Sequence, residues 1–382
     1  MDSDRQHTRL VELARLFLRL GTLGFGGPAV HLTLIEEETV QRRQWLSRDA
    51  FVDLVGLTNL IPGPNSTEMA MAVGYRRAGW LGLLVAGSCF IAPAAAITMA
   101  LAWAYVQFGT LPTVVGLLSG TGPAVVAVMT VGIVRMGKTA LRQWPMVTVA
   151  AIVCALGVAG IDPFVLLVAG AICGLACSWA RMFIGAVLML MSGQTAIFAV
   201  ATLSESRHLP RLQDIATFFF KVGAILYGSG YVLIALLRTL VSPLAWLTER
   251  QLVDAVAAGQ VTPGPVLTTA TFIGYLLGGP AGALVATAAI FLPAFLFVSL
   301  LEPVIVRFGT SPRARRFLDV VNATAIGLMG AVTIQLAVNL SAQPHLWPAA
   351  IAAAGIGLSG KSTIWMLIVA VSVTLVINLA IS

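Results

Sequence analysis

Residues 51–74 read FVDLVGLTNLIPGPNSTEMAMAVG, and residues 251–277 read QLVDAVAAGQVTPGPVLTTATFIGYLL. Both are apolar stretches long enough to cross a bilayer, and each is interrupted near its middle by the sequence PGP. A proline inside a helix removes a backbone hydrogen bond and clashes with the preceding turn. Each stretch is therefore predicted to be a broken helix. We call residues 62–64 the first break and residues 263–265 the second break.

The composition of the whole chain is typical of a membrane protein. Of the 382 residues, 58% are hydrophobic and 10% are charged, whereas a soluble domain carries about 25% charged residues. Apolar stretches long enough to span a bilayer recur along the chain. We therefore expect an all-α polytopic membrane protein with about thirteen transmembrane helices.

The formal net charge of +7 does not indicate a nucleic-acid partner. The basic residues stand singly or in short clusters between apolar stretches, as they do in cytoplasmic loops. The N-terminal segment lacks a compact apolar core and a cleavage site, so we expect no removed signal peptide. We expect no cofactor, disulfide or metal site either, because the cysteines all lie within apolar stretches: Cys89, Cys154, Cys173 and Cys177.

The second half of the chain repeats the first. Ordered matches include Phe17 with Phe219, Trp45 with Trp246, Asp53 with Asp254, Pro93 with Pro293, and Phe108 with Phe308. Duplicated halves are common in transporter folds. We predict an N-terminal transmembrane repeat over residues 1–203, a hydrophilic linker over 204–214 and a C-terminal transmembrane repeat over 215–382.

The distribution of arginine predicts that the two repeats have inverted topology. Arg76 and Arg77 follow the first broken span, whereas the second repeat carries its arginines in a later loop, at residues 307–316. Counting positive charges then places the N-terminus in the cytoplasm. Residues 36–50 do not fit, because three arginines lie where an external loop is expected. This region is either an interfacial helix or a sign that residues 15–35 are not one span.

The breaks are the candidate binding site. A half-helix that begins after each break presents unpaired N–H donors and a partial positive charge, which suits an anion at the bilayer midplane. We place Gly63 and Gly264 near the N-cap positions and Pro64 and Pro265 at N1. Glycines at 24–27 and 228–230 interrupt another pair of spans. The candidate substrate-binding residues are Arg19, Gly26, Gly27, Pro62, Gly63, Pro64, Asn65, Ser66, Thr67, Lys221, Gly228, Ser229, Pro263, Gly264, Pro265 and Thr268.

Several charged residues have two interpretations that the sequence leaves open. Arg19 and Lys221 either neutralise an anion or extend their charged ends to an interface. Glu68 is either a carboxylate stabilised by the half-helix dipole or a proton carrier for coupled transport. Asp53 and Asp254 fit interfacial or capping positions better than a pathway.

One motif is rejected on context. Residues 355–362, GIGLSGKS, fit the pattern of an ATP-binding P-loop. That loop needs a preceding strand in a soluble nucleotide domain, whereas this one joins two apolar spans. We expect no nucleotide binding there and no enzymatic activity.

The sequence GFGGP at 24–28, the WLS at 45–47 and the duplicated PGP resemble the chromate ion transporter (CHR) family in its long-chain, two-domain form. The resemblance implies chromate efflux across the bacterial inner membrane, and hence chromate resistance, with sulfate as a related oxyanion. The second repeat departs from the family pattern at residues 227–230 and lacks the NSTE run after its break. If the substrate is bound asymmetrically, we therefore expect the first half to contribute more to its binding.

The expected partners are a small oxyanion, chromate or sulfate, and the lipid bilayer. The sequence leaves a homodimer open. Moving a dianion outward through about 100 mV releases roughly 4.6 kcal/mol, so efflux needs no coupling ion. Proton-coupled uptake or exchange of sulfate, and a scaffold or enzyme whose repeat is only architectural, remain the alternatives.

Overall fold

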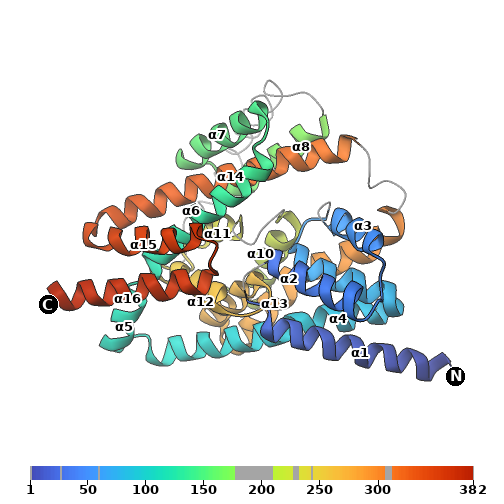
Figure 1. Ribbon diagram of the computed structural model, residues 1–382. Helices are drawn as coiled ribbons and strands as arrows, with labels where there is room; N and C mark the ends of the chain where they lie inside the picture. Colours follow the sequence, from blue (N-terminus) through green and yellow to red (C-terminus); the bar gives the residue numbers. More distant parts are fainter. Residues whose placement is uncertain are drawn as a thin grey trace.

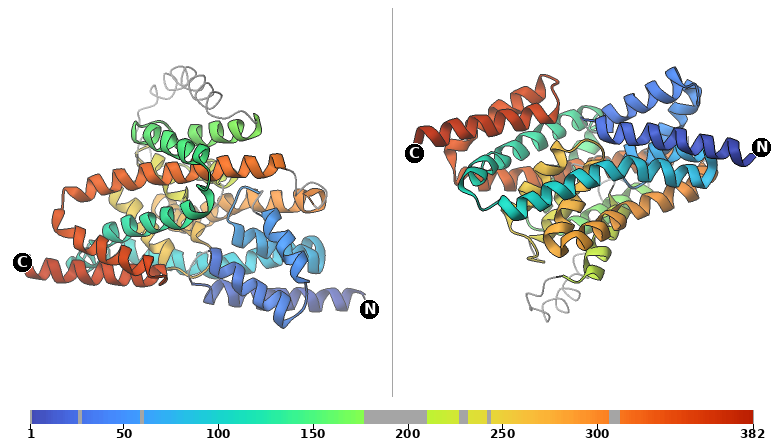
Figure 2. Two further views of the ribbon diagram at one scale, coloured as in Figure 1. Left: turned by 45° about the horizontal axis from the view of Figure 1, so that its top comes forward. Right: turned by 90° about the horizontal axis from the view of Figure 1, so that it is seen from below.

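Helices make up all the regular structure in the described part of the chain. The computed structural model describes residues 2–25, 28–58, 61–176, 210–226, 232–241, 244–305 and 312–381. Most long helices lie roughly along one direction, and the N- and C-termini lie at opposite ends (Figures 1 and 2). Five described helices are long and apolar enough to cross a membrane: Asn65–Phe108, Val114–Lys138, Val266–Leu300, Arg316–Ser341 and Thr363–Ala380.

The helices of the first half are α1 (Asp2–Leu23), α2 (Pro28–Glu36), a π-helix (Glu37–Arg42), α3 (Arg48–Thr58), α4 (Asn65–Phe108), α5 (Pro112–Leu118), α6 (Thr121–Ala140), α7 (Trp144–Val158) and α8 (Pro163–Ala176). Those of the second half are α10 (Leu212–Ile225), α11 (Val232–Leu237), α12 (Glu249–Val261), α13 (Thr269–Ile305), α14 (Pro312–Ser341), α15 (Trp347–Leu358) and α16 (Thr363–Ile381), with 3-10 turns at Arg238–Leu240, Val266–Thr268 and Pro344–Leu346. The count of about thirteen spans is not confirmed, and residues 177–209, which include the end of the first repeat and part of the linker, lie outside the described residues.

Helices α4 and α13 are each a hairpin of a short and a long arm. The helical backbone is broken at Ala78 and Gly79 in α4, and at residues 278–279 in α13. The two arms then pack so closely that a Cβ atom added at Gly74 would overlap the carbonyl oxygen of Gly82. In α13 the hydroxyls of Thr271 and Thr287 lie 2.7 Å apart across the same kind of contact.

The helix before each hairpin packs against its long arm in the same way in both halves. On α1, a Cβ at Gly21 would press on the backbone of Phe90 in α4. On α10, a Cβ at Gly223 would press on the backbone of Ile290 in α13. Glycine is needed at both places because the helix backbones approach without room for a side chain. The sequence repeat is therefore matched by a repeated packing arrangement.

The expectation that residues 15–35 form one span is wrong. They are divided between α1 and α2, and α2 has nine residues, or about 13.5 Å, less than half of a hydrocarbon core. The chain turns back after α1, since Glu38 lies 3.8 Å from Arg19. Of the two interpretations of residues 36–50, the structure therefore supports the one in which residues 15–35 are not a single span.

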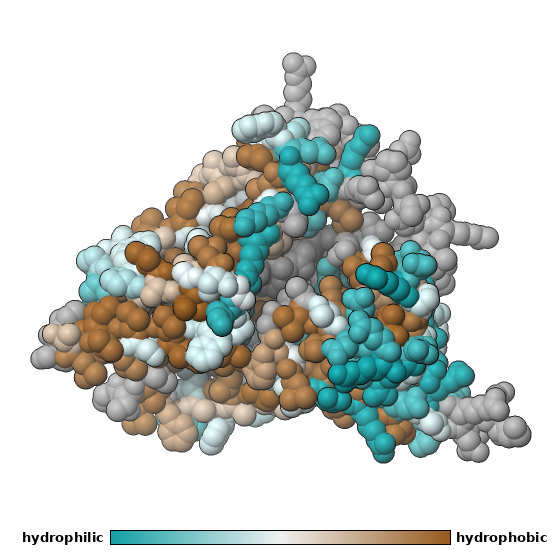
Figure 3. Space-filling model, viewed as in Figure 1, coloured by the Kyte–Doolittle hydropathy of each residue, from teal (hydrophilic) through white to brown (hydrophobic). Residues whose placement is uncertain are grey.

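Residues 36–45 lie beside α1 and the kink of α4. The Arg77 guanidinium lies 4.8 Å from the ring centre of Trp45 and 2.9 Å from a carboxylate oxygen of Glu12. Figure 3 shows hydrophilic residues gathered over the region of α1 to α3, whereas the surface near α15 and α16 is mostly hydrophobic. Arg42 and Arg43 both contact Glu38, and Arg43 lies 5.2 Å from the ring centre of Trp45, so these two arginines lie in the same region as Arg77.

The glycine contact within α4 makes a testable prediction. Gly74→Val should destabilise the protein by about 1–3 kcal/mol, because the new side chain must displace the backbone of the opposite arm. The matched control is Gly56→Val on α3, where nothing lies within 4 Å of an added Cβ. Thermal unfolding in detergent compares the two variants. Equal melting temperatures would contradict the hairpin packing.

Candidate functional site

The two breaks begin their half-helices with proline as the N-cap, one residue later than expected. Pro64 caps α4 with φ −82° and ψ 100°, and Pro265 caps the turn before α13 with φ −67° and ψ 126°. Gly63 and Gly264 stand before them with φ of +147° and +89°. Side chains rarely adopt these positive angles, which explains the glycine between the prolines.

Some of the backbone amides expected to be free are already bonded. The Thr67 and Glu68 amides both donate to the carbonyl oxygen of Pro64, at 2.7 and 3.2 Å. The Thr268 amide donates to the carbonyl oxygen of Pro265 at 3.1 Å. These three amides therefore already have partners within the first turns of the half-helices.

Each break lies against the long arm of the other half. An added Cβ at Gly63 would lie 3.4 Å from the Cβ of Ala294 in α13, and one at Gly264 would lie 2.9 Å from the Cβ of Ala94 in α4. The Gly264 amide also donates to the carbonyl oxygen of Gly24 at 2.9 Å. The two breaks and the end of α1 therefore meet around the α4–α13 pair.

Three threonine hydroxyls meet at the second break. Thr98 of α4 lies 3.3 Å from the hydroxyl of Thr262 and 3.2 Å from that of Thr268. All three side chains are buried. Thr262 and Thr268 also donate to backbone carbonyls at the end of α12 and in the break, at 2.8 and 2.9 Å. We call these residues the hydroxyl cluster; it joins the second break to the first half.

The first break has a different lining. The positions equivalent to Thr98 and Thr262 are Val298 and Ile61, which are buried and apolar. Within the described residues, the Thr67 hydroxyl and both carboxylate oxygens of Glu68 are buried and have no hydrogen-bond partner. Glu68 is 0% exposed. The two breaks are thus chemically distinct despite their common backbone pattern.

The other candidate residues are placed as follows. Pro62, Ser66 and Pro263 are buried in the breaks, and Asn65 is half-buried. Arg19 and Lys221 are exposed on α1 and α10, and Arg19 lies near Glu38, so neither guanidinium nor ammonium is enclosed at a break. The candidates outside the described residues are Gly26, Gly27, Gly228 and Ser229.

Asp254 has a role that the sequence did not reveal. Its carboxylate accepts hydrogen bonds from Tyr105 of α4 at 3.0 Å and from Thr121 of α6 at 2.7 Å, and it lies 3.8 Å from Arg250. Its counterpart Asp53 is exposed, so the matched aspartates differ. Thr98 and Tyr105 stand seven residues apart, two turns along one helix face, and this spacing of polar residues in an apolar helix is the signal that could have indicated the contact.

Comparison with known proteins identifies the family. The model of the chromate transporter family matches residues 11–175 and, a second time, residues 213–377. The chain is 33% identical to the chromate transport protein of Cupriavidus metallidurans over 86% of this chain and 82% of that protein. It is 32% identical to a probable chromate transport protein of Synechococcus elongatus, over 85% of this chain and 84% of that protein.

A third relative is the chromate transport protein of Pseudomonas aeruginosa, 32% identical over 85% of this chain and 80% of that protein. No solved structure matches the chain. The family match covers both repeats and includes the two breaks and the α4–α13 pair. This multi-pass, apolar helical chain therefore belongs to the chromate transporter family.

Proposed function

We propose that the protein moves chromate, a tetrahedral oxyanion, out of the cell across the bacterial inner membrane, which confers chromate resistance. The observation that carries the proposal is the meeting of both breaks at the α4–α13 pair. Irregular backbone inside a membrane protein is tolerated where it is buried in protein or lines a cavity, and corresponding broken segments in two repeats point to a transport site.

The substrate site is assigned to the breaks and their first turns. Backbone amides and hydroxyls donate hydrogen bonds to an anion without the desolvation cost of burying a cationic side chain. Asn65 and Ser66 carry such groups at the first break. At the second break the Thr268 amide and hydroxyl both donate to the carbonyl oxygen of Pro265 and must exchange one of these bonds to hold the anion. Arg19 and Lys221, being exposed, are assigned to the approach of the anion.

The two repeats, residues 1–203 and 215–382, are proposed to have inverted topology with 204–214 as their linker. The reciprocal contacts of Gly63 with Ala294 and of Gly264 with Ala94 are what a pseudo-twofold axis between the repeats produces, and in an inverted repeat that axis lies in the membrane plane. The arginines gathered beside α1, Arg42, Arg43 and Arg77, support a cytoplasmic location for that end of the molecule.

The membrane potential is the proposed driving force. An inside-negative potential of about 100 mV releases about 2.3 kcal/mol for each charge that leaves, so about 4.6 kcal/mol for a dianion. That energy is enough to export the dianion against a concentration ratio of more than about a thousandfold. Efflux then requires no coupled ion.

Asn65 provides the most direct test of the site. Asn65→Leu should lower chromate flux at least about tenfold, because an apolar side chain replaces a polar group at the start of the half-helix and one charge-assisted hydrogen bond contributes about 1.5–3 kcal/mol. Flux is measured in liposomes at matched protein content.

The matched control is Val266→Leu, at the equivalent half-buried position after the second break. This variant exchanges one apolar residue for another and should retain flux. A well-folded Asn65→Leu protein with normal flux would contradict the assignment of the first break as a binding site.

Glu68 separates potential-driven transport from proton-coupled transport. Glu68→Gln should keep potential-driven flux within about threefold, because efflux of a dianion needs no proton. Glu68→Thr, which installs the residue found at the equivalent position 269, checks that any loss is not caused by the amide. Flux is measured across a range of pH. Loss of flux together with its pH dependence in both variants would show that Glu68 carries a coupled proton.

A further inference from the structure

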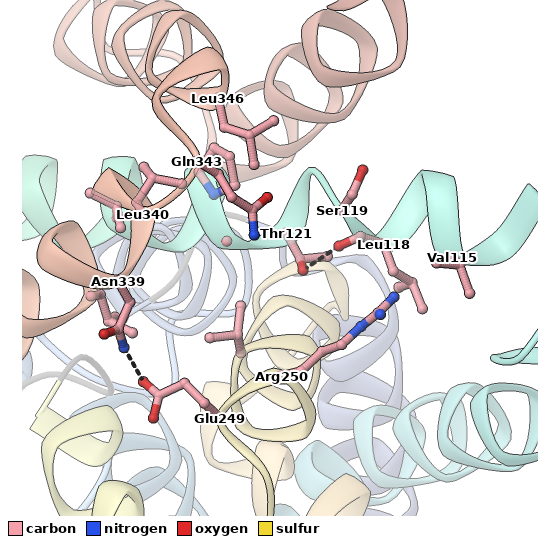
Figure 4. A pocket seen from close by; sticks show the side chains of 15 residues that line it. Val115, Leu118, Ser119, Thr121, Glu249, Arg250, Asn339, Leu340, Gln343 and Leu346 are labelled. Carbon is pink, nitrogen blue, oxygen red and sulfur yellow. Dashed lines mark hydrogen bonds between the residues drawn. The ribbon is translucent and has the colours of Figure 1, made fainter. Parts of the chain in front are cut away.

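A cavity lies at the far end of α4 from the cluster of Arg77 and Trp45. Its volume is about 390 Å³, and it lies between α5, α6, α12 and α14. The first residues of α12, Glu249 and Arg250, form part of its wall together with Leu118 and the amide side chains of Asn339 and Gln343. Figure 4 shows these side chains around the cavity.

The two charged side chains at the cavity, Glu249 and Arg250, differ in their contacts. Glu249 is compensated, since it lies 3.4 Å from Arg238 and accepts a hydrogen bond from Asn339 at 3.3 Å. Arg250 runs in another direction, toward Leu118 (Figure 4). Within the described residues its guanidinium makes no hydrogen bond, and its one ion-pair contact is Asp254 at 3.8 Å. The cavity therefore holds a guanidinium with unused donors.

Asp254 positions Arg250 through one ion-pair contact of 3.8 Å and accepts no hydrogen bond from its guanidinium among the described residues. The carboxylate is buried and already accepts hydrogen bonds from Tyr105 and Thr121. These contacts hold α12 against α4 and α6. The Arg250 side chain remains 54% exposed, so its outer donors face the cavity.

Helix α12 leads from the cavity to the second break. Arg250 and Asp254 stand four residues apart and share one face of the helix, and Thr262 caps its far end. From Arg250 to Thr262 the helix covers about 18 Å. Helix α12 thus carries Asp254 and Arg250 near the cavity and ends at the hydroxyl cluster.

The first half lacks this arrangement. The residues equivalent to Arg250, Asp254 and Thr262 are Asp49, Asp53 and Ile61. Both aspartates are exposed on α3, and Ile61 is buried. The exposed guanidinium of Arg250 attracts an anion, whereas the exposed aspartates of α3 repel one, so the feature is confined to the second half.

We propose that this cavity is a vestibule in which Arg250 binds a small divalent oxyanion that retains part of its water shell. The volume exceeds by far that of a single water molecule, so an oxyanion fits with water around it. A positive charge in a partly enclosed cleft raises the local concentration of anions. This inference rests on the proposed function. Because the cavity lies at the end of α4 away from Arg77 and the proposed cytoplasmic end, the vestibule is the exit of the path.

The test measures the local potential with thiol reagents and does not require transport. In full-length protein with the four native cysteines replaced by alanine, Leu118→Cys places a reporter beside Arg250. The reaction rates of an anionic and a cationic methanethiosulfonate reagent of similar size are compared in phosphatidylcholine nanodiscs. Arg250→Gln should lower the ratio of anionic to cationic rate at least about fivefold.

Two controls keep the test specific. Arg142→Gln removes the same charge from an exposed position at the opposite end of α6 and should leave the ratio unchanged. Val253→Cys is a second reporter on the cavity wall, in case Leu118→Cys impairs folding. Sulfate should slow modification of either reporter in the presence of Arg250 and protect at least about fivefold less in Arg250→Gln.

A reagent ratio that does not depend on Arg250, or the absence of sulfate protection, would overturn the vestibule even if wild-type protein transports chromate. Protection that follows the content of phosphatidylglycerol instead of sulfate would assign the cavity to a lipid phosphate and overturn it as well. Conversely, an Arg250-dependent sulfate effect in a protein that moves no chromate would leave the vestibule standing and reject the proposed substrate.

Discussion

The hydrogen bond from the Gly264 amide to the Gly24 carbonyl oxygen joins irregular backbone of the two halves at the centre of the molecule. In an apolar environment every backbone donor and acceptor requires a partner, and a broken helix exposes several. The chain meets this requirement with contacts between the two halves. The second break donates a hydrogen bond to Gly24 at the end of α1 and packs on Ala94 of α4. Such contact demands small residues, which explains the glycines and alanines here.

The same contacts between the halves make the two breaks unequal. The hydroxyl cluster combines Thr98 of the first half with Thr262 and Thr268 of the second. At the first break, the buried carboxylate of Glu68 has no hydrogen-bond partner among the residues that the structure describes. A duplicated backbone therefore supports two chemical environments. The proposed exit lies on the side of the hydroxyl cluster, along the α12 face that carries Asp254 and Arg250. The expectation that the first half contributes more to substrate binding stays a prediction.

The sequence predicted the helical membrane class, the repeat and the positions of the breaks, because apolar length, ordered matches and paired prolines are local signals. It did not predict the turn between α1 and α2, since a glycine-rich interruption is compatible with a packed span as well as with a reversal. Nor did it predict the contact of Asp254 with Tyr105 and Thr121, which come from distant helices. Such contacts depend on which helix faces meet, and hydropathy alone does not specify that.

The most direct measurement of the central claim is chromate flux by the purified, unmodified protein in liposomes under an imposed potassium-diffusion potential of either sign. The account predicts flux whose direction reverses with the sign of the potential, that persists without a proton gradient and that falls when excess sulfate is added. Flux that appears only with a proton gradient would contradict the potential-driven mechanism. No flux under either potential would contradict the assignment of the two breaks as a chromate pathway.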